Sequence, residues 1–169
     1  KETVNDIKQG SLNIRDLGYI TPTYLKAVDK NNAYYINRLP KIGVYQLNED
    51  SYESIDWKSI DKSIKEKRLN HLELEVILGK EDKLGTRMVI IPVPENVARK
   101  RIHKAKQGGK RSNGYQLSKE YKLKAHYNIF ITNVPKEVLT AKEVFEAYTL
   151  RWQIELVFKT WKSNLNINK

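Results

Sequence analysis

The sequence of 169 residues contains no cysteine, one methionine and no long apolar run. Because thiolates are absent, disulfides and cysteine-based zinc sites are excluded, and a reducing compartment fits best. No apolar stretch approaches the about 20 residues of a membrane-spanning helix, so no membrane partner is expected. The first ten residues, KETVNDIKQG, do not resemble a signal peptide. The three histidines, His71, His103 and His126, are scattered without metal-ligand spacing.

Positive charge is what the sequence has in excess. Lysine and arginine number 31 against 20 acidic residues, which gives a net charge of +11. Such a balance indicates a polyanionic partner, most often nucleic acid. With 40% apolar residues the chain can bury a core, and its length is that of one domain or of one domain with a large insertion.

The first forty residues predict a strand, a helix and a second strand. Residues 11–16, SLNIRD, alternate apolar and polar side chains, as a strand does. Thr21 and Pro22 have the residue types of a helix N-cap and first helical position, and the helix should reach Asp29. Residues 33–39, AYYINRL, read as the second strand. The order predicts a βαβ unit with parallel strands.

Residues 40–126 have a different character, typical of an antiparallel β-rich insertion. Residues 71–78, HLELEVIL, alternate strictly, and residues 87–93, RMVIIPV, form another apolar run. A charged helix is expected over residues 95–107. Ten basic residues against one acid lie between positions 97 and 125, which predicts a basic arm. The arm residues expected to contact a polyanion are Arg99, Lys100, Arg101 and Lys104.

The last part of the chain, residues 127–169, predicts one strand, YNIFITNV, and a long helix. Thr140 and Glu143 have the spacing of a capping box at the start of that helix. One helical stripe, about 80° wide at 100° per residue, is polar; it carries Tyr148, Arg151, Glu155, Lys159 and Lys162. The opposite side is the expected core face, with Leu150, Ile154, Val157 and Trp161. Taken alone, the polar stripe is most simply a solvated surface of charge pairs.

The spacing Tyr148-x2-Arg151-x3-Glu155-x6-Lys162 resembles the Tyr-x2-Arg-x3-Glu-x6-Lys signature of a group of bacterial insertion-sequence DDE transposases. Residues 16–19, Asp-Leu-Gly-Tyr, are similar to the group's sequence around its second acidic residue. The resemblance implies an α/β fold, with a partial RNase H-like core interrupted by the β-rich insertion. It assigns residues 1–39 and 127–169 to the core and residues 40–126 to the insertion.

The resemblance also implies roles for single residues. Asp16 and Glu155 match the second and third catalytic carboxylates, which would hold Mg²⁺ or Mn²⁺, two ions in the complete protein. The positions that match DNA contacts are Tyr148, Arg151 and Lys162, with Lys159 as a further phosphate contact. Trp152 resembles an aromatic residue that holds an unstacked base, although packing explains a tryptophan there equally well.

The implied partners are transposon-end DNA and target DNA, bound by a homodimer in a synaptic complex. The implied location is the bacterial cytoplasm, at the nucleoid when the protein is bound to DNA. Strand cleavage and transfer in a cut-and-paste reaction is the implied activity.

One feature of the resembled group is missing from the 169 residues. A complete centre needs a first aspartate on an earlier strand, but only Asp6 precedes Asp16, and it lies in a segment with helical character. The sequence therefore predicts the C-terminal part of a catalytic domain, inactive alone. The alternative is a non-catalytic basic DNA-binding module. The catalytic reading predicts that Asp16 and Glu155 converge, with Tyr148, Arg151 and Lys162 accessible beside them.

Overall fold

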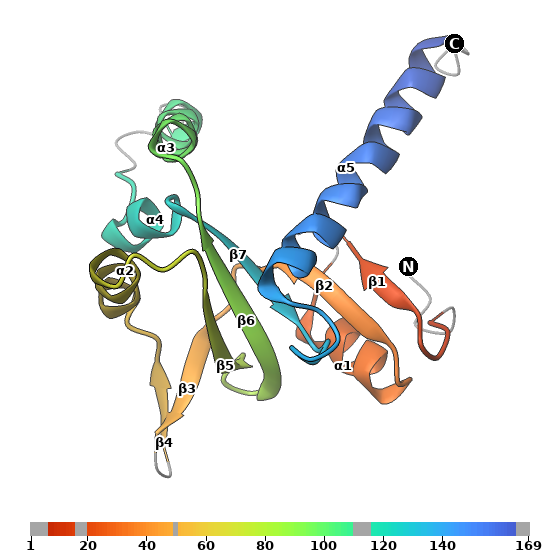
Figure 1. Cartoon of the computed structure of the whole chain (residues 1–169), viewed down its shortest axis with the longest axis horizontal. Helices are drawn as coiled ribbons and strands as arrows, with labels where there is room; N and C mark the ends of the chain where they lie inside the picture. The colour runs from red at the N-terminus through yellow and green to blue at the C-terminus, as the bar shows by residue number, and fades with distance from the viewer. Residues whose placement is uncertain (1–6, 16–19, 49–50, 110–115, 165–169) are drawn as a thin grey trace.

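The computed structural model describes residues 7–15, 20–48, 51–109 and 116–164. Near the end of the chain it describes side chains up to Gln153 and, beyond that, those of Leu156 and Thr160. The described part forms one seven-stranded sheet with five helices, a mixed α/β fold (Figure 1). No helix among these residues is both long and apolar enough to cross a membrane.

The strand order in the sheet is β1-β2-β7-β6-β5-β3-β4. The strands are β1 (Leu12–Ile14), β2 (Tyr34–Arg38), β3 (Val44–Asn48), β4 (Ser51–Ser54), β5 (Leu72–Leu78), β6 (Leu84–Pro92) and β7 (Tyr127–Thr132). The helices are α1 (Pro22–Lys30), α2 (Trp57–Glu66), α3 (Glu95–Gly109), α4 (Lys119–Lys124) and α5 (Ala141–Asn164). The β1–β2 pair is parallel, and the other pairs are antiparallel.

The βαβ unit predicted for the first forty residues is confirmed. The Thr21 hydroxyl accepts a hydrogen bond from the Tyr24 amide at 3.1 Å, and Pro22 is the first residue of α1. The helix returns the chain so that β1 and β2 pair in parallel, with Ile14 opposite Ile36. Thr21 and Pro22 were enough to predict where α1 begins, because an N-cap side chain and a proline with a fixed φ both act within the first turn of a helix.

The strands predicted at residues 71–78 and 87–93 form as β5 and β6, which pair from Leu72 opposite Ile90 to Leu78 opposite Leu84. The structure adds α2, α4, β3 and β4, which were not predicted. Because β7 pairs with both β2 and β6, the strands of residues 40–126 continue the sheet that β1 and β2 begin. The division of the chain at residues 39 and 126 stays an interpretation of the sequence.

The two faces of the sheet are covered by different helices. Side chains alternate along each strand, so neighbouring residues face opposite sides. On one face the core contains Tyr35, Met88 and Ile131, and the apolar sides of α1 and α2 pack there. On the other face Ile36, Val89 and Phe130 form a smaller cluster with the first turns of α5. This smaller cluster contains Tyr148, one of the predicted site residues, and Ile14, which lies two residues before Asp16.

Candidate functional site

The end of β1 and the base of α5 contribute to the same apolar cluster. Ile14, the last residue of β1, packs on the cluster that contains Val144 and Tyr148. The next residue, Arg15, donates its backbone amide to Asn37 Oδ1 at 2.9 Å, and Asn37 is fully buried in β2. Asn37 therefore fixes the chain immediately before Asp16, a role that the sequence did not reveal. Asp16 itself lies outside the described residues.

The first turn of α5 has the predicted capping box. Glu143 Oε2 accepts hydrogen bonds from the Thr140 amide and hydroxyl, both at 2.8 Å, and the Glu143 amide donates to the Thr140 hydroxyl at 3.3 Å. The bond from the Thr140 amide is the main cause that lowers the pKa of the Glu143 carboxyl, and the bond from the hydroxyl acts in the same direction. The negative charge also lies at the positive end of the helix dipole.

The structure corrects the predicted orientation of α5 at Tyr148 and Leu150; the side chains of the other predicted core residues, Ile154, Val157 and Trp161, lie outside the described part. Tyr148 was expected to be accessible, but its side chain is 4% exposed and its ring centroid lies 5.1 Å from that of Phe130. Leu150 was expected in the core, but it is 52% exposed. The reason is that small residues, Ala141 and Ala147, let the helix approach the sheet on the side that carries Tyr148. Tyr148 is thus a packing residue at the base of the site.

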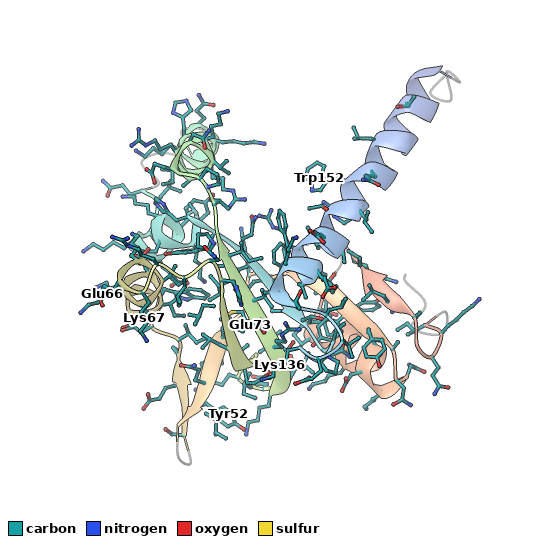
Figure 2. The ribbon with its side chains drawn as sticks, viewed as in Figure 1. Tyr52, Glu66, Lys67, Glu73, Lys136 and Trp152 are labelled. Carbon is teal, nitrogen blue, oxygen red and sulfur yellow. The ribbon has the colours of Figure 1, made fainter. Side chains whose placement is uncertain are left out.

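Arg151 and Trp152 follow on the next turn, where α5 leaves the sheet. The Arg151 guanidinium carbon lies 5.5 Å from the Tyr148 ring centroid and 5.2 Å from that of Trp152, so it is bracketed by two rings. Trp152 is 53% exposed, and Figure 2 shows it projecting from the side of α5. Of the two explanations for Trp152, its exposure argues against core packing.

Three predicted site residues, Glu155, Lys159 and Lys162, lie in α5, but their side chains are outside the described part of the structure. The convergence of Asp16 and Glu155 therefore stays a prediction. Among the described residues, no group of three histidine, aspartate or glutamate side chains is placed to hold a metal ion.

The basic residues of the predicted arm lie in α3 and α4, apart from Lys110 and Arg111, which are outside the described residues. Arg99, Lys100 and Lys104 are exposed on α3, as expected. Arg101 differs from the prediction because its side chain turns inward. It donates Nη1 to the carbonyl oxygen of Tyr127 at 2.9 Å and Nη2 to Asn128 Oδ1 at 2.6 Å, so it ties α3 to the start of β7.

Known proteins match the chain over its whole length. The family model described as the transposase DDE domain matches residues 1–169. The chain belongs to this transposase family. Three curated relatives are transposases of insertion sequence elements. The chain is 35% identical to that of IS231E from Bacillus thuringiensis subsp. finitimus and 31% identical to that of IS231B from subsp. berliner, in both cases over 99% of the chain and 37% of the relative. It is 29% identical to that of IS1151 from Clostridium perfringens, over 94% of the chain and 36% of the relative.

The transposase chain thus spans a little over a third of the length of these relatives. No solved structure matches it. The relatives support the resemblance found in the sequence, because they match the chain from end to end rather than in one motif.

In this transposase domain, Arg38 is another residue that the sequence did not reveal. It ends β2 and donates Nη2 to Asn128 Oδ1 at 3.2 Å, the same oxygen that Arg101 contacts. Burial and, secondly, the charge of Arg38 lower the pKa of Arg101. Among the described residues, neither arginine has a carboxylate within 4.0 Å. The pair lines a cavity of about 600 Å³ together with Lys41 and Lys124.

Proposed function

We propose that this chain supplies the second and third carboxylates of a DDE catalytic centre, Asp16 and Glu155, in an RNase H-like core. The complete protein would cleave and transfer DNA strands at transposon ends in a cut-and-paste reaction. Its partners would be transposon-end and target DNA, held by a homodimer in the bacterial cytoplasm.

The observation that carries this proposal is that the end of β1 and the base of α5 contribute to one apolar cluster on the same face of the sheet. Ile14 lies two residues before Asp16 and packs on the same cluster as Tyr148, which lies seven residues before Glu155. Ile14 lies on the side of the sheet that α5 covers; we expect Asp16 on the same side, as it would be if the strand alternation continued for two residues past β1. A parallel β1–β2 pair, an antiparallel β7 and a helix on this face also support the RNase H-like core.

The donor set suits hard divalent ions. Carboxylate oxygens are the ligands that Mg²⁺ and Mn²⁺ prefer, and the sequence offers no thiolate for a softer metal. Asp16 and Glu155 would hold the ions. When bound, two such ions stabilise the attacking and leaving oxygens of a phosphodiester.

The described residues around this centre are suited to hold DNA. Arg151, bracketed by the rings of Tyr148 and Trp152, is oriented by them. An exposed ring such as Trp152 can stack on a base, worth about 1–3 kcal/mol. Arg38 and Arg101 both donate to Asn128 Oδ1 and line a cavity with Lys41 and Lys124, and this concentration of positive charge is suited to attract phosphate.

The 169-residue chain on its own should not cleave transposon-end DNA with Mg²⁺ or Mn²⁺. Apart from Glu2, the only acid that precedes Asp16 is Asp6, so two carboxylates would have to hold two ions. A gel assay of nicked and cut strands at rising metal concentration measures this. Reproducible nicking that disappears in Glu155→Ala would contradict the expectation.

The same variant separates the proposal from the alternative, a non-catalytic DNA-binding module. We expect weak Mn²⁺ binding by the chain, reduced in both Glu155→Ala and Asp16→Ala, as measured by the paramagnetic resonance signal of free Mn²⁺. A binding module has no need of a divalent ion, and equal Mn²⁺ binding by all three proteins would favour it.

Affinity for duplex DNA should fall steeply with salt and depend on α3. Each phosphate contact adds about −0.9 to the slope of log K against log salt. Replacing Arg99, Lys100 and Lys104 together by alanine should flatten this slope, measured by fluorescence anisotropy. Replacing three exposed lysines of α2 or its C-cap, Lys58, Lys62 and Lys67, is the matched control. Equal slopes for the two triple variants would show that the basic residues of α3 do not contact DNA phosphates any more than those of α2 do.

A further inference from the structure

One buried arginine, Arg87, donates hydrogen bonds to both ends of the loop between β7 and α5. Arg87 lies in β6 and is 6% exposed. Its Nε donates to Glu73 Oε2 at 2.7 Å, while its Nη1 donates to the carbonyl oxygens of Val134 at 3.1 Å and Leu139 at 2.8 Å. A single guanidinium therefore joins β5, β6 and both ends of the β7–α5 loop.

The two carbonyls occupy the positions that define how the helix begins. Val134 lies two residues after the end of β7, and Leu139 immediately precedes Thr140 of the capping box. Within the loop, the amides of Val138 and Leu139 donate to the Pro135 carbonyl at 3.0 and 3.1 Å. The first end of the loop is also held by Asn133, whose Oδ1 accepts from the Tyr35 amide at 2.8 Å, and by the Val134 amide, which donates to Thr132 Oγ1 at 3.0 Å. Arg87 is the side chain that contacts both ends of the loop.

The direction of α5 matters because the helix is long and its described buried side chains all lie near its base. It has 24 residues, and the buried ones described are Ala141, Val144 and Tyr148. Farther along, Leu150, Trp152 and Leu156 are more than half exposed, and Figure 1 shows the helix rising away from the sheet.

A small rotation at the base is amplified along the helix. At about 1.5 Å per residue, Glu155 lies roughly 10 Å beyond Tyr148 along the axis. A tilt of about 10° at Tyr148 would displace Glu155 by about 2 Å, and a misplacement of about 1 Å in an active site can cost on the order of 100-fold in rate.

We propose that Arg87 is a positioning residue that sets the direction in which α5 leaves the sheet, and with it the place of Glu155. This inference rests on the proposed function for its catalytic meaning, but the direction of α5 can be measured without DNA or metal. Arg87 touches no reacting group in this proposal and acts through the loop and the helix.

The contrasting explanation is that Arg87 only stabilises the sheet through Glu73. The two explanations differ in which contacts matter. Glu73→Gln keeps an oxygen acceptor for Nε and leaves both carbonyl contacts intact, whereas Arg87→Met removes all three contacts at a similar side-chain length. In Arg87→Lys, one ammonium group cannot span the carboxylate and the two carbonyls as a planar guanidinium does.

The test measures a distance distribution between spin labels in the whole chain. The sequence has no cysteine, so Gln153→Cys on α5 and Lys67→Cys beside α2 label two exposed positions uniquely. The unmodified background and Glu73→Gln should give the same narrow distribution. Arg87→Met should broaden or shift it by several Å, and Arg87→Lys should fall between. Circular dichroism and amide exchange in β6 and β7 show that each variant is folded.

A folded Arg87→Met chain with the unmodified distribution would overturn the inference. If Arg87→Met does not fold, Arg87→Lys decides in the same way, and an unmodified distribution in that variant would overturn the inference. Equal shifts in Glu73→Gln and Arg87→Met would also overturn it, because the salt bridge rather than the loop contacts would then hold the helix. Absence of DNA or Mn²⁺ binding by the unmodified chain would count against the proposed function and leave this distance result intact.

Discussion

Replacing Tyr148 by alanine should lower the free energy of unfolding by about 3–5 kcal/mol, the usual cost of removing a large buried aromatic side chain. Tyr148 is 4% exposed, and its ring lies against Phe130 at 5.1 Å with the planes inclined at 53°. Its removal would leave a cavity between α5 and the sheet in the cluster that also holds Ile36 and Val89. Urea denaturation followed by circular dichroism measures the loss.

Two further variants serve as controls for Tyr148→Ala. Leu150→Ala, two residues further along the same helix, should cost no more than about 0.5 kcal/mol because exposed positions away from special features rarely cost more; Leu150 is 52% exposed. Tyr148→Phe keeps the ring contacts and should lose far less stability than Tyr148→Ala. If Leu150→Ala proved the costly change and Tyr148→Ala the mild one, α5 would be oriented as its sequence periodicity suggested.

The βαβ unit and the start of α5 could be predicted because their signals are local. Thr21 caps α1 through the Tyr24 amide, and Thr140 exchanges hydrogen bonds with Glu143. In each case the interacting residues lie within three positions of each other. Such signals are independent of where the rest of the chain folds.

The buried face of α5 could not be predicted because its apolar residues lie on more than one side. The periodicity that predicted a core face covers residues 148–162, and the side chains of many of these residues lie outside the described part. The cluster with the sheet instead uses Ala141, Val144 and Tyr148. Where a long helix leaves a sheet depends on the position of strands distant in sequence, such as β2 and β6, and periodicity contains no information about it.

Other features had signals in the sequence that were not used. Asp56 precedes Trp57, Ile60 and Ile64, a capped apolar stripe that forms α2. In α3 the inward side is formed by Ala98, Ile102 and Ala105, and Arg101 lies at the edge of this side in helical projection, about 40° from Ala105. The catalytic assignment of Asp16 and Glu155 comes from the family resemblance and stays a prediction.

The role of Arg87 had no such signal. Its partners in the loop are the carbonyl groups of Val134 and Leu139, and every residue of the chain carries the same backbone carbonyl. Sequence patterns distinguish side chains, so a contact to distant backbone becomes visible only in the folded structure.

Stability should fall as the pH rises from about 10 to about 12 because of Tyr35. Its side chain is fully buried, and its hydroxyl donates to Thr86 Oγ1 at 2.8 Å. Thr86 in turn donates to the Thr132 carbonyl at 3.0 Å, and the Thr132 hydroxyl donates to the Tyr35 carbonyl at 2.6 Å. Burial is the main cause that raises the pKa of Tyr35 from 10.0 to about 12. The network joins β2, β6 and β7, next to the loop that carries α5.

The direction of the effect follows from proton binding. Between these two pKa values the unfolded chain loses the Tyr35 proton while the folded chain retains it, so rising pH favours unfolding. The contribution is fully present below pH 10 and is lost as the pH rises through about 12. A difference of two pKa units corresponds to about 3 kcal/mol.

Tyr35→Phe isolates this contribution from the other groups that titrate in the same range. The difference in unfolding free energy between the unmodified chain and Tyr35→Phe, measured in urea at half-unit steps from pH 8.5 to 12, cancels their common effects. We expect the unmodified chain to be the more stable protein at pH 8.5, since the variant would leave Thr86 without the hydroxyl that donates to it. The unmodified chain should lose this advantage steadily above pH 10. A difference that stays constant with pH would show that the Tyr35 proton is no harder to remove in the folded chain than in the unfolded one.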